Sequence, residues 1–203
     1  MDDVIADYAA AATPALIAGY DALPPEQIYA SVLDLLPDPP ARVADIGAGT
    51  GRDAEWLARQ GHHVIAIEPV RAFREAGAAL HGERIEWLDD RLPELSETAR
   101  RGPFDLLLLC AVWHHLDTPA RAVTMASLAR IAAPGCRLIL SLRHDPGPPG
   151  PHSFATPPDE AIDLARAAGF GLLRRTETGS VHPESQARGV RWTWLALSKR
   201  ETP

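Results

Sequence analysis

The chain has 203 residues, of which 46% are hydrophobic, and its formal net charge is −7. This length and apolar content are enough for one sizeable core and favour a single domain over residues 1–203. The acidic balance disfavours nucleic acid as a partner, because phosphate backbones repel a negatively charged protein. The N-terminus lacks the basic segment of a signal peptide, and no apolar run is long enough to span a membrane, so we expect a cytoplasmic protein without membrane contact.

The first forty residues have helical character. Apolar residues recur at helical spacing between positions 3 and 36, and Pro24-Pro25 interrupts the pattern. We therefore expect residues 1–40 to form an N-terminal helical cap in front of a core that covers residues 41–198.

Strand-like and helix-like segments alternate through this core. The predicted strands are 42–47, 63–69, 84–90, 104–112, 136–143, 171–178 and 189–198. The predicted helices are 53–61, 71–80, 119–135 and 159–170. This alternation predicts an α/β fold with a Rossmann-like, doubly wound sheet of about seven strands, mostly parallel and with helices on both faces. The last two strands have no long helix between them, which predicts an antiparallel hairpin at one edge of the sheet.

Three glycines, Gly47, Gly49 and Gly51, stand where the first strand turns into a helix. Ligands of doubly wound sheets bind at the carboxyl ends of the strands, and a backbone without Cβ atoms allows a ligand to approach closely. Glu68 ends the next strand, where a carboxylate can accept two hydrogen bonds from a ribose diol. The pattern therefore predicts a nucleoside-containing ligand.

Two further residues argue against a dinucleotide. The dinucleotide fingerprint needs a glycine at position 52, which is Arg52 in this chain. Asp45, just before the loop, disfavours a pyrophosphate and favours a ligand that carries positive charge. An NAD(P)-dependent reductase is therefore disfavoured.

At these residues the sequence resembles the class I S-adenosylmethionine-dependent methyltransferases. "VADIGAGTGRDA" (43–54) resembles their first motif, "IAIEP" (65–69) the second, "WLDD" (87–90) the third and "FDLLLLCAVWHHL" (104–116) the fourth. The resemblance covers roughly residues 40–198 and implies S-adenosylmethionine as the cofactor. It implies that Glu68 holds the ribose, that Asp89 or Asp90 contacts the adenine, and that Asp45 faces the cationic part. The full set of implied cofactor-binding residues is Asp45, Gly47, Ala48, Gly49, Gly51, Glu68, Pro69, Leu88, Asp89, Asp90, Cys110 and Trp113.

The acceptor site is expected at the same edge of the sheet. The strands 104–112 and 136–143 are predicted to be parallel neighbours, so His114, His115 and Arg143 should lie close together just beyond their ends. We expect catalytic roles for these three residues, since a histidine can take a proton near pH 7. Arg143 could bind an anionic substrate group, or it could pair with Asp145.

The proline-rich loop 145–158 follows this edge and is either a substrate lid carrying His152 and Phe154 or an exposed loop. Tyr8, Tyr20, Trp192 and Trp194 are interpreted as packing residues. No His/Asp/Glu cluster has metal-ligand spacing, so no metal site is expected.

The resulting hypothesis is a methyltransferase that acts on an anionic or hydroxylated small molecule. The alternative is a non-catalytic S-adenosylmethionine-binding module with a sensor or scaffold role. The oligomeric state stays open.

Overall fold

A seven-stranded sheet forms the centre of the computed structural model, which describes residues 1–147 and 152–201. The strands are β1 (Arg42–Ile46), β2 (His63–Ile67), β3 (Glu86–Leu88), β4 (Phe104–Leu109), β5 (Ala132–His144), β6 (Phe170–Gly179) and β7 (Arg191–Lys199). Their order in the sheet is β3-β2-β1-β4-β5-β7-β6. Strands β1 to β5 pair in parallel, and β7 runs antiparallel to both β5 and β6. The predicted sheet with its antiparallel edge hairpin is confirmed.

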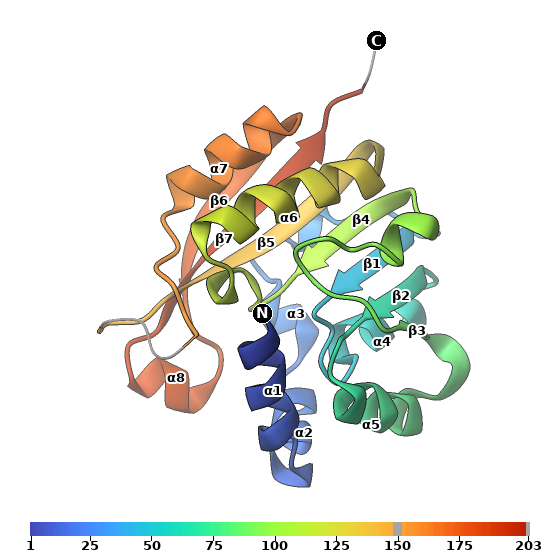
Figure 1. Ribbon diagram of the computed structural model, residues 1–203, viewed down its shortest axis with the longest axis vertical. Helices are drawn as coiled ribbons and strands as arrows, with labels where there is room; N and C mark the ends of the chain where they lie inside the picture. Colours follow the sequence, from blue (N-terminus) through green and yellow to red (C-terminus); the bar gives the residue numbers. More distant parts are fainter. Residues whose placement is uncertain (148–151, 202–203) are drawn as a thin grey trace.

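Helices cover both faces of this sheet (Figure 1), with α6 and α7 on one side and α3 and α4 on the other. The α-helices are α1 (Asp2–Ala11), α2 (Pro14–Asp21), α3 (Pro25–Ile28), α4 (Arg52–Arg59), α5 (Arg71–His81), α6 (Thr118–Ile131), α7 (Pro158–Ala167) and α8 (Pro183–Ala187). Short 3-10 turns are η1 (Leu33–Leu35), η2 (Gly82–Arg84), η3 (Thr98–Arg100) and η4 (Trp113–His115). Within the described ranges, no helix is long and apolar enough to cross a membrane.

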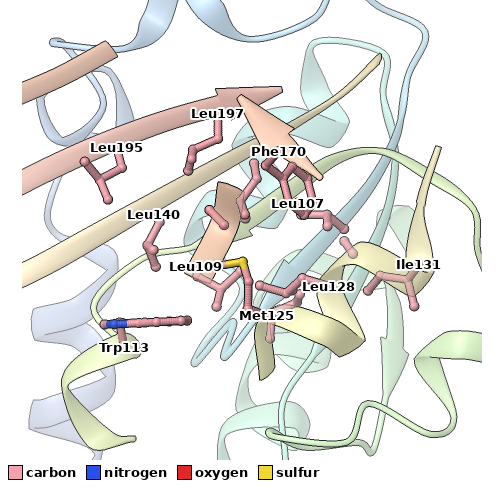
Figure 2. Close-up of a cluster of buried hydrophobic side chains, with 14 of the residues drawn as sticks. Leu107, Leu109, Trp113, Met125, Leu128, Ile131, Leu140, Phe170, Leu195 and Leu197 are labelled. Carbon is pink, nitrogen blue, oxygen red and sulfur yellow. The ribbon is translucent and has the colours of Figure 1, made fainter. Parts of the chain in front are cut away.

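Strand β4 divides its leucines between two buried clusters, because successive side chains of a strand point to opposite faces. Leu107 and Leu109 pack toward Met125 and Leu128 of α6, as Figure 2 shows. Leu106 and Leu108 belong to the cluster on the opposite face of the sheet, together with residues of α4. Each of the four leucines is fully buried, which explains the continuous apolar run in the sequence.

Among the boundaries that differ from the prediction, those of α6 and β4 have a clear cause in the chain. Helix α6 ends at Ile131 rather than at position 135, and the chain passes directly into β5. Pro134 explains the early end, because the residue before a proline avoids the α region. Strand β4 ends at Leu109 rather than at position 112, and Ala111 then adopts a φ of 59°. This turn directs the chain into η4 at the carboxyl edge of the sheet.

Candidate active site

The loop between β1 and α4 contains the three glycines, and each has a positive φ. A Cβ atom on Gly47 would lie 2.5 Å from Cγ2 of Val112, and one on Gly51 would lie 2.7 Å from the ring of Trp87. A Cβ atom on Gly49 would meet nothing within 4 Å. Gly47 and Gly51 are therefore required by packing inside the protein, and Gly49 alone leaves space for a ligand.

A cavity of about 450 Å³ opens beside this loop. Its volume lies in the range of roughly 300–1,000 Å³ that is usual for small-molecule sites. The cavity extends from the glycine loop across the carboxyl ends of β4 and β5, and helix α1 contributes to its wall. Of the predicted site residues, those that line it are Asp45, Gly47, Ala48, Gly49, Glu68, Pro69, Asp90, Cys110, His114, His115 and Arg143.

Glu68 lies just beyond the end of β2, next to the glycine loop. Its Oε2 accepts a hydrogen bond of 2.8 Å from the backbone N–H of Gly49, and its Oε1 accepts one of 2.8 Å from Val70. Burial raises the pKa of Glu68 to about 7, although the two backbone hydrogen bonds oppose this rise. The structure thus brings a carboxylate to the loop position from which it could reach a ribose.

Asp45 is the acidic residue of β1 and is only 2% exposed. Its Oδ2 is buried and has no hydrogen-bond partner among the described residues. Burial and the neighbouring charge of Asp53 raise the pKa of Asp45 well above its usual value. A buried carboxylate oxygen without a partner is costly, and a cationic ligand group would satisfy it.

Arg52 and Asp53 complete the charged end of the cavity. The Arg52 guanidinium donates two hydrogen bonds to Asp53, from Nε to Oδ1 at 2.7 Å and from Nη2 to Oδ2 at 2.9 Å. The hydroxyl of Tyr29 also donates to Asp53 Oδ2 at 2.7 Å. Arg52 was not expected at the site, although its position as the first helical residue after the glycines could have indicated it.

The third motif contributes one of its two aspartates to the cavity. Asp90 lines the cavity, and its Oδ2 accepts hydrogen bonds from the backbone N–H and the hydroxyl of Thr98, both at 2.7 Å. Asp89 is exposed and pairs with Arg74 at 2.6 Å. Leu88 packs against the core rather than lining the cavity. The geometry therefore favours Asp90 where the sequence left the choice open.

Trp113 differs from its expected position. It is 0% exposed and lies in the core cluster with Leu109 and Met125 (Figure 2), so it does not line the cavity. The turn at Ala111 explains this, because it directs Val112 and His114 toward the cavity and Trp113 between them into the core. Cys110 does line the cavity, and burial raises the pKa of its thiol to about 12.

His115 forms a chain of hydrogen bonds between a backbone carbonyl and Tyr8. Its Nδ1 lies 3.0 Å from the carbonyl oxygen of His152, and its Nε2 lies 3.1 Å from the hydroxyl of Tyr8. A carbonyl can only accept, so Nδ1 carries the proton and the unprotonated Nε2 accepts from the Tyr8 hydroxyl. Burial raises the pKa of Tyr8 to about 12, and burial lowers the pKa of His115. Both groups are therefore neutral at pH 7.

His114 has a different environment from His115. It is buried, lines the cavity, and its Nδ1 has no hydrogen-bond partner among the described residues. Burial and the neighbouring His115 lower the pKa of His114 to about 3. Such a weak base is poorly matched to proton transfer near pH 7, so His114 is suited to binding.

Arg143 pairs with Asp145, which was one of the two alternatives expected from the sequence. Its Nε and Nη2 donate to the two carboxylate oxygens of Asp145 at 2.8 and 2.9 Å. The guanidinium also lies 5.6 Å from the ring centre of Trp192. Asp145 therefore neutralises the charge of Arg143, and the guanidinium is not free to bind an anionic substrate group.

The predicted lid lies partly outside the described residues, at positions 148–151. In the described part, the backbone N–H of Phe154 donates to the carbonyl of His114 at 2.8 Å. The side chain of Phe154 is 43% exposed, and neither it nor His152 lines the cavity. The loop thus supports η4 through its backbone.

Several cavity residues were interpreted from the sequence as packing residues or not singled out. Tyr8, Tyr20, Trp192 and Trp194 all line the cavity. The connection from β6 to β7 lines it as well, through Thr178 to His182 and Ser185, and so does Ser31 after α3. Figure 1 shows α8 and α1 at the same end of the sheet.

The chain matches the methyltransferase-domain family over residues 20–196. It is 37% identical over 109 residues to a ubiquinone biosynthesis O-methyltransferase of Xylella fastidiosa, which covers 50% of this chain and 41% of that relative. The chain thus spans about two fifths of the length of this curated relative.

Solved structures share the fold over most of the chain. The 1,6-didemethyltoxoflavin-N1-methyltransferase of Burkholderia thailandensis, with bound 1,6-didemethyltoxoflavin and S-adenosylhomocysteine, has a TM-score of 0.71 at 23% identity and covers 98% of this chain and 87% of that one. The magnesium protoporphyrin IX methyltransferase of Synechocystis with bound S-adenosylmethionine has a TM-score of 0.67 at 17% identity and covers 90% and 80%. Because the family match takes in well over half of the residues, the chain belongs to the class I S-adenosylmethionine-dependent methyltransferases.

Proposed function

We propose that this protein transfers a methyl group from S-adenosylmethionine to a hydroxyl group of a small molecule. The observation that carries the proposal is one cavity that has the unpaired carboxylate oxygen of Asp45 at one end and the Tyr8–His115 pair at another part of its wall. The first suits a cationic cofactor, and the second suits a protonated nucleophile.

The residues around the glycine loop fit S-adenosylmethionine. In this proposal Asp45 offers a carboxylate oxygen to a positive charge, Glu68 offers its carboxylate to the ribose diol, and Asp90 contacts the adenine. The open space above Gly49 accommodates the ligand itself. When bound, the cofactor supplies an electrophilic methyl group on a sulfonium.

The acceptor hydroxyl must lose its proton as its oxygen forms the bond to the methyl carbon. His115 is the base in this proposal, since its Nε2 has the lone pair that now accepts the hydrogen bond of Tyr8. Tyr8 can relay the proton: its oxygen accepts the proton of the acceptor while its own proton passes to Nε2 of His115. The charge then rests on the imidazolium, whose Nδ1–H is held by the carbonyl of His152.

Arg143 contributes to acceptor binding in this proposal through its contact with Trp192, and His114 contributes through its unpaired Nδ1. A hydroxylated acceptor is favoured over an anionic one, because the Arg143 guanidinium already donates two hydrogen bonds to Asp145.

Calorimetry followed by turnover tests the proposal. S-adenosylmethionine and S-adenosylhomocysteine are expected to bind, and NADH is not. A library of hydroxylated metabolites is then incubated with the protein and S-adenosylmethionine, and mass spectrometry is used to find methylated products. Cofactor binding without any methylated product would favour the non-catalytic binding module instead.

Replacement of Glu68 is expected to weaken cofactor binding. Glu68→Ala removes hydrogen bonds to a charged acceptor, so the affinity for S-adenosylhomocysteine should fall by about 1.5–3 kcal/mol. A 2′-deoxy analogue should lose much of its affinity for the wild type and little for the variant. Glu86→Ala, at an exposed position of β3, serves as the control. Equal losses of the analogue with both proteins would contradict the ribose contact.

The affinity for S-adenosylhomocysteine is also expected to depend on pH through Glu68. Its pKa is raised to about 7, so the free protein carries an increasingly protonated Glu68 as the pH falls below that value. Because the ionised carboxylate accepts the hydrogen bonds of the diol, affinity should rise from pH 5.5 to pH 8. Calorimetry over this range with wild type and Glu68→Gln checks the prediction, since the variant should lack the Glu68 contribution. Parallel pH profiles for the two proteins would contradict it.

A further inference from the structure

The part of the cavity lined by η4, β5 and the edge strands β6 and β7 points to the chemical class of the acceptor. We call this part the acceptor half; it consists of Ser31, His114, His115, Arg143, Thr178 to His182, Trp192 and Trp194. Resting on the methyl transfer proposed above, we infer that the acceptor is an uncharged planar aromatic compound with hydrogen-bonding groups at both ends.

The charges around the acceptor half favour an uncharged acceptor. Arg143 is the one side chain of the acceptor half that is cationic at every ordinary pH, and both oxygens of Asp145 already neutralise it. His114 and His115 are neutral at pH 7, since burial lowers the pKa of each. The remaining charged residues of the cavity belong to its cofactor end or, like Arg91, pair with α1. An anionic acceptor would thus meet no free arginine or lysine in the acceptor half and would have to compete with Asp145.

Aromatic rings form much of the wall of the acceptor half. Trp192 and Trp194 alternate along β7 and lie on the same face of the sheet. The His114 ring stands nearly edge-on to the Trp192 ring, at 74° and 6.2 Å between ring centres. The Arg143 guanidinium contacts Trp192 as well. Flat aromatic walls are best filled by a flat aromatic ligand, which can stack on one ring and meet the edge of another.

Polar atoms without a hydrogen-bond partner lie near β4 and near β6, two strands that β5 and β7 separate in the sheet. His114 Nδ1 is on η4, next to β4, while His182 Nδ1 and Ser31 Oγ are near β6. All three atoms are buried and lack a hydrogen-bond partner among the described residues. Their backbones are held in place: the N–H of His182 donates to Ser180 Oγ at 3.2 Å, and Arg174 donates to the carbonyl of Ser31 at 3.0 Å. Buried polar atoms are normally satisfied, so an acceptor with polar groups at both ends supplies what the protein lacks.

Three probes test this class. The first is 3,4-dihydroxyacetophenone, which is neutral and aromatic and carries polar groups at both ends; the second is anionic 3,4-dihydroxybenzoate; the third is the saturated trans-1,2-cyclohexanediol. Each is titrated by calorimetry into the protein saturated with S-adenosylhomocysteine. The ketone is expected to bind at least ten times more tightly than either of the others.

The outcomes separate this inference from the proposed function. Tighter or equal binding of the benzoate or of the diol, or no binding of the ketone, overturns the inference. Failure of S-adenosylhomocysteine itself to bind overturns the proposed function. Cofactor binding together with a preference for the benzoate leaves methyl transfer standing and refutes only the neutral aromatic acceptor.

Variants of Ser31 and His182 test whether the ketone group of the acceptor binds near these two residues. Ser31→Ala and His182→Ala are each expected to lower the affinity for 3,4-dihydroxyacetophenone by about fivefold, the effect of one lost hydrogen bond. They should not change the affinity for catechol, which has the same hydroxyl groups and no ketone. His63→Ala, at the exposed start of β2, is the matched histidine control. Equal loss for the ketone and for catechol, or no loss in either variant, contradicts the placement of the ketone near Ser31 and His182.

Discussion

Gly49→Val is expected to lower the affinity for S-adenosylhomocysteine at least 100-fold, about 2.8 kcal/mol. Gly49 is the glycine of the loop at which an added Cβ meets no protein atom within 4 Å, and it lines the cavity. A branched side chain there would occupy ligand volume without disturbing the packing of Val112 or Trp87. Overfilling a well-packed site typically costs about 1–3 kcal/mol and occasionally more, and the rigid loop gives the cofactor little room to move aside. Calorimetry measures the loss.

Backbone strain could mimic this effect, since Gly49 has a φ of 58°. Gly135→Val controls for it, because Gly135 has a φ of 76° and also has nothing within 4 Å of an added Cβ, and it lies in β5 outside the cavity lining. Both variants should lose thermal stability, and only Gly49→Val should lose cofactor affinity. Equal affinity in both variants would contradict the placement of the cofactor over the loop.

The glycine loop also illustrates what the sequence can and cannot predict. Three glycines after an apolar run locate a ligand loop, because the motif is local. The reason why each position requires a glycine is not local. Val112 in the β4–η4 turn leaves no room for a side chain at position 47, and Trp87 of β3 leaves none at position 51. Only the folded chain distinguishes a glycine needed for packing from one needed for the ligand.

Trp113 and Arg143 each depend on geometry that the sequence does not contain. The resemblance implied that Trp113 binds the cofactor, but the apolar run 104–112 contains no signal for the turn at Ala111, after which Trp113 enters the core. For Arg143, the sequence offered Asp145 and a substrate anion equally. The structure resolves the choice, because both carboxylate oxygens of Asp145 lie within 2.9 Å of the guanidinium.

The contribution of the β6–β7 connection could have been predicted. The edge hairpin was expected from the sequence, and an antiparallel β7 beside β5 must begin where β5 ends. The connection that leads into Trp192 therefore lies at the carboxyl edge, where ligands of this fold bind. That topological step, rather than any motif, identifies His182 as a cavity residue.

His115→Ala is expected to lower kcat for the methylation of 3,4-dihydroxyacetophenone by about 100-fold or more, the scale of a lost general base. The structure supports this through the tautomer, because the carbonyl of His152 fixes the proton on Nδ1 and leaves Nε2 free to accept one. Cofactor affinity should change little. Initial rates measured by product mass spectrometry, with His63→Ala as the control, check the expectation.

The pH profile and a double-mutant cycle decide whether His115 acts as a base through Tyr8. Because burial lowers the pKa of His115 below its usual value, the wild-type kcat at saturating S-adenosylmethionine should be level near pH 7 and fall only on the acidic side of about 6.5, where the imidazole takes up a proton. His115→Ala should lack this acidic limb. Tyr8→Phe should lower kcat in the wild type and have little further effect in His115→Ala, since its hydroxyl acts on Nε2. Full additivity of the two losses, or an unchanged acidic limb in His115→Ala, would show that the proton of the acceptor leaves by another route.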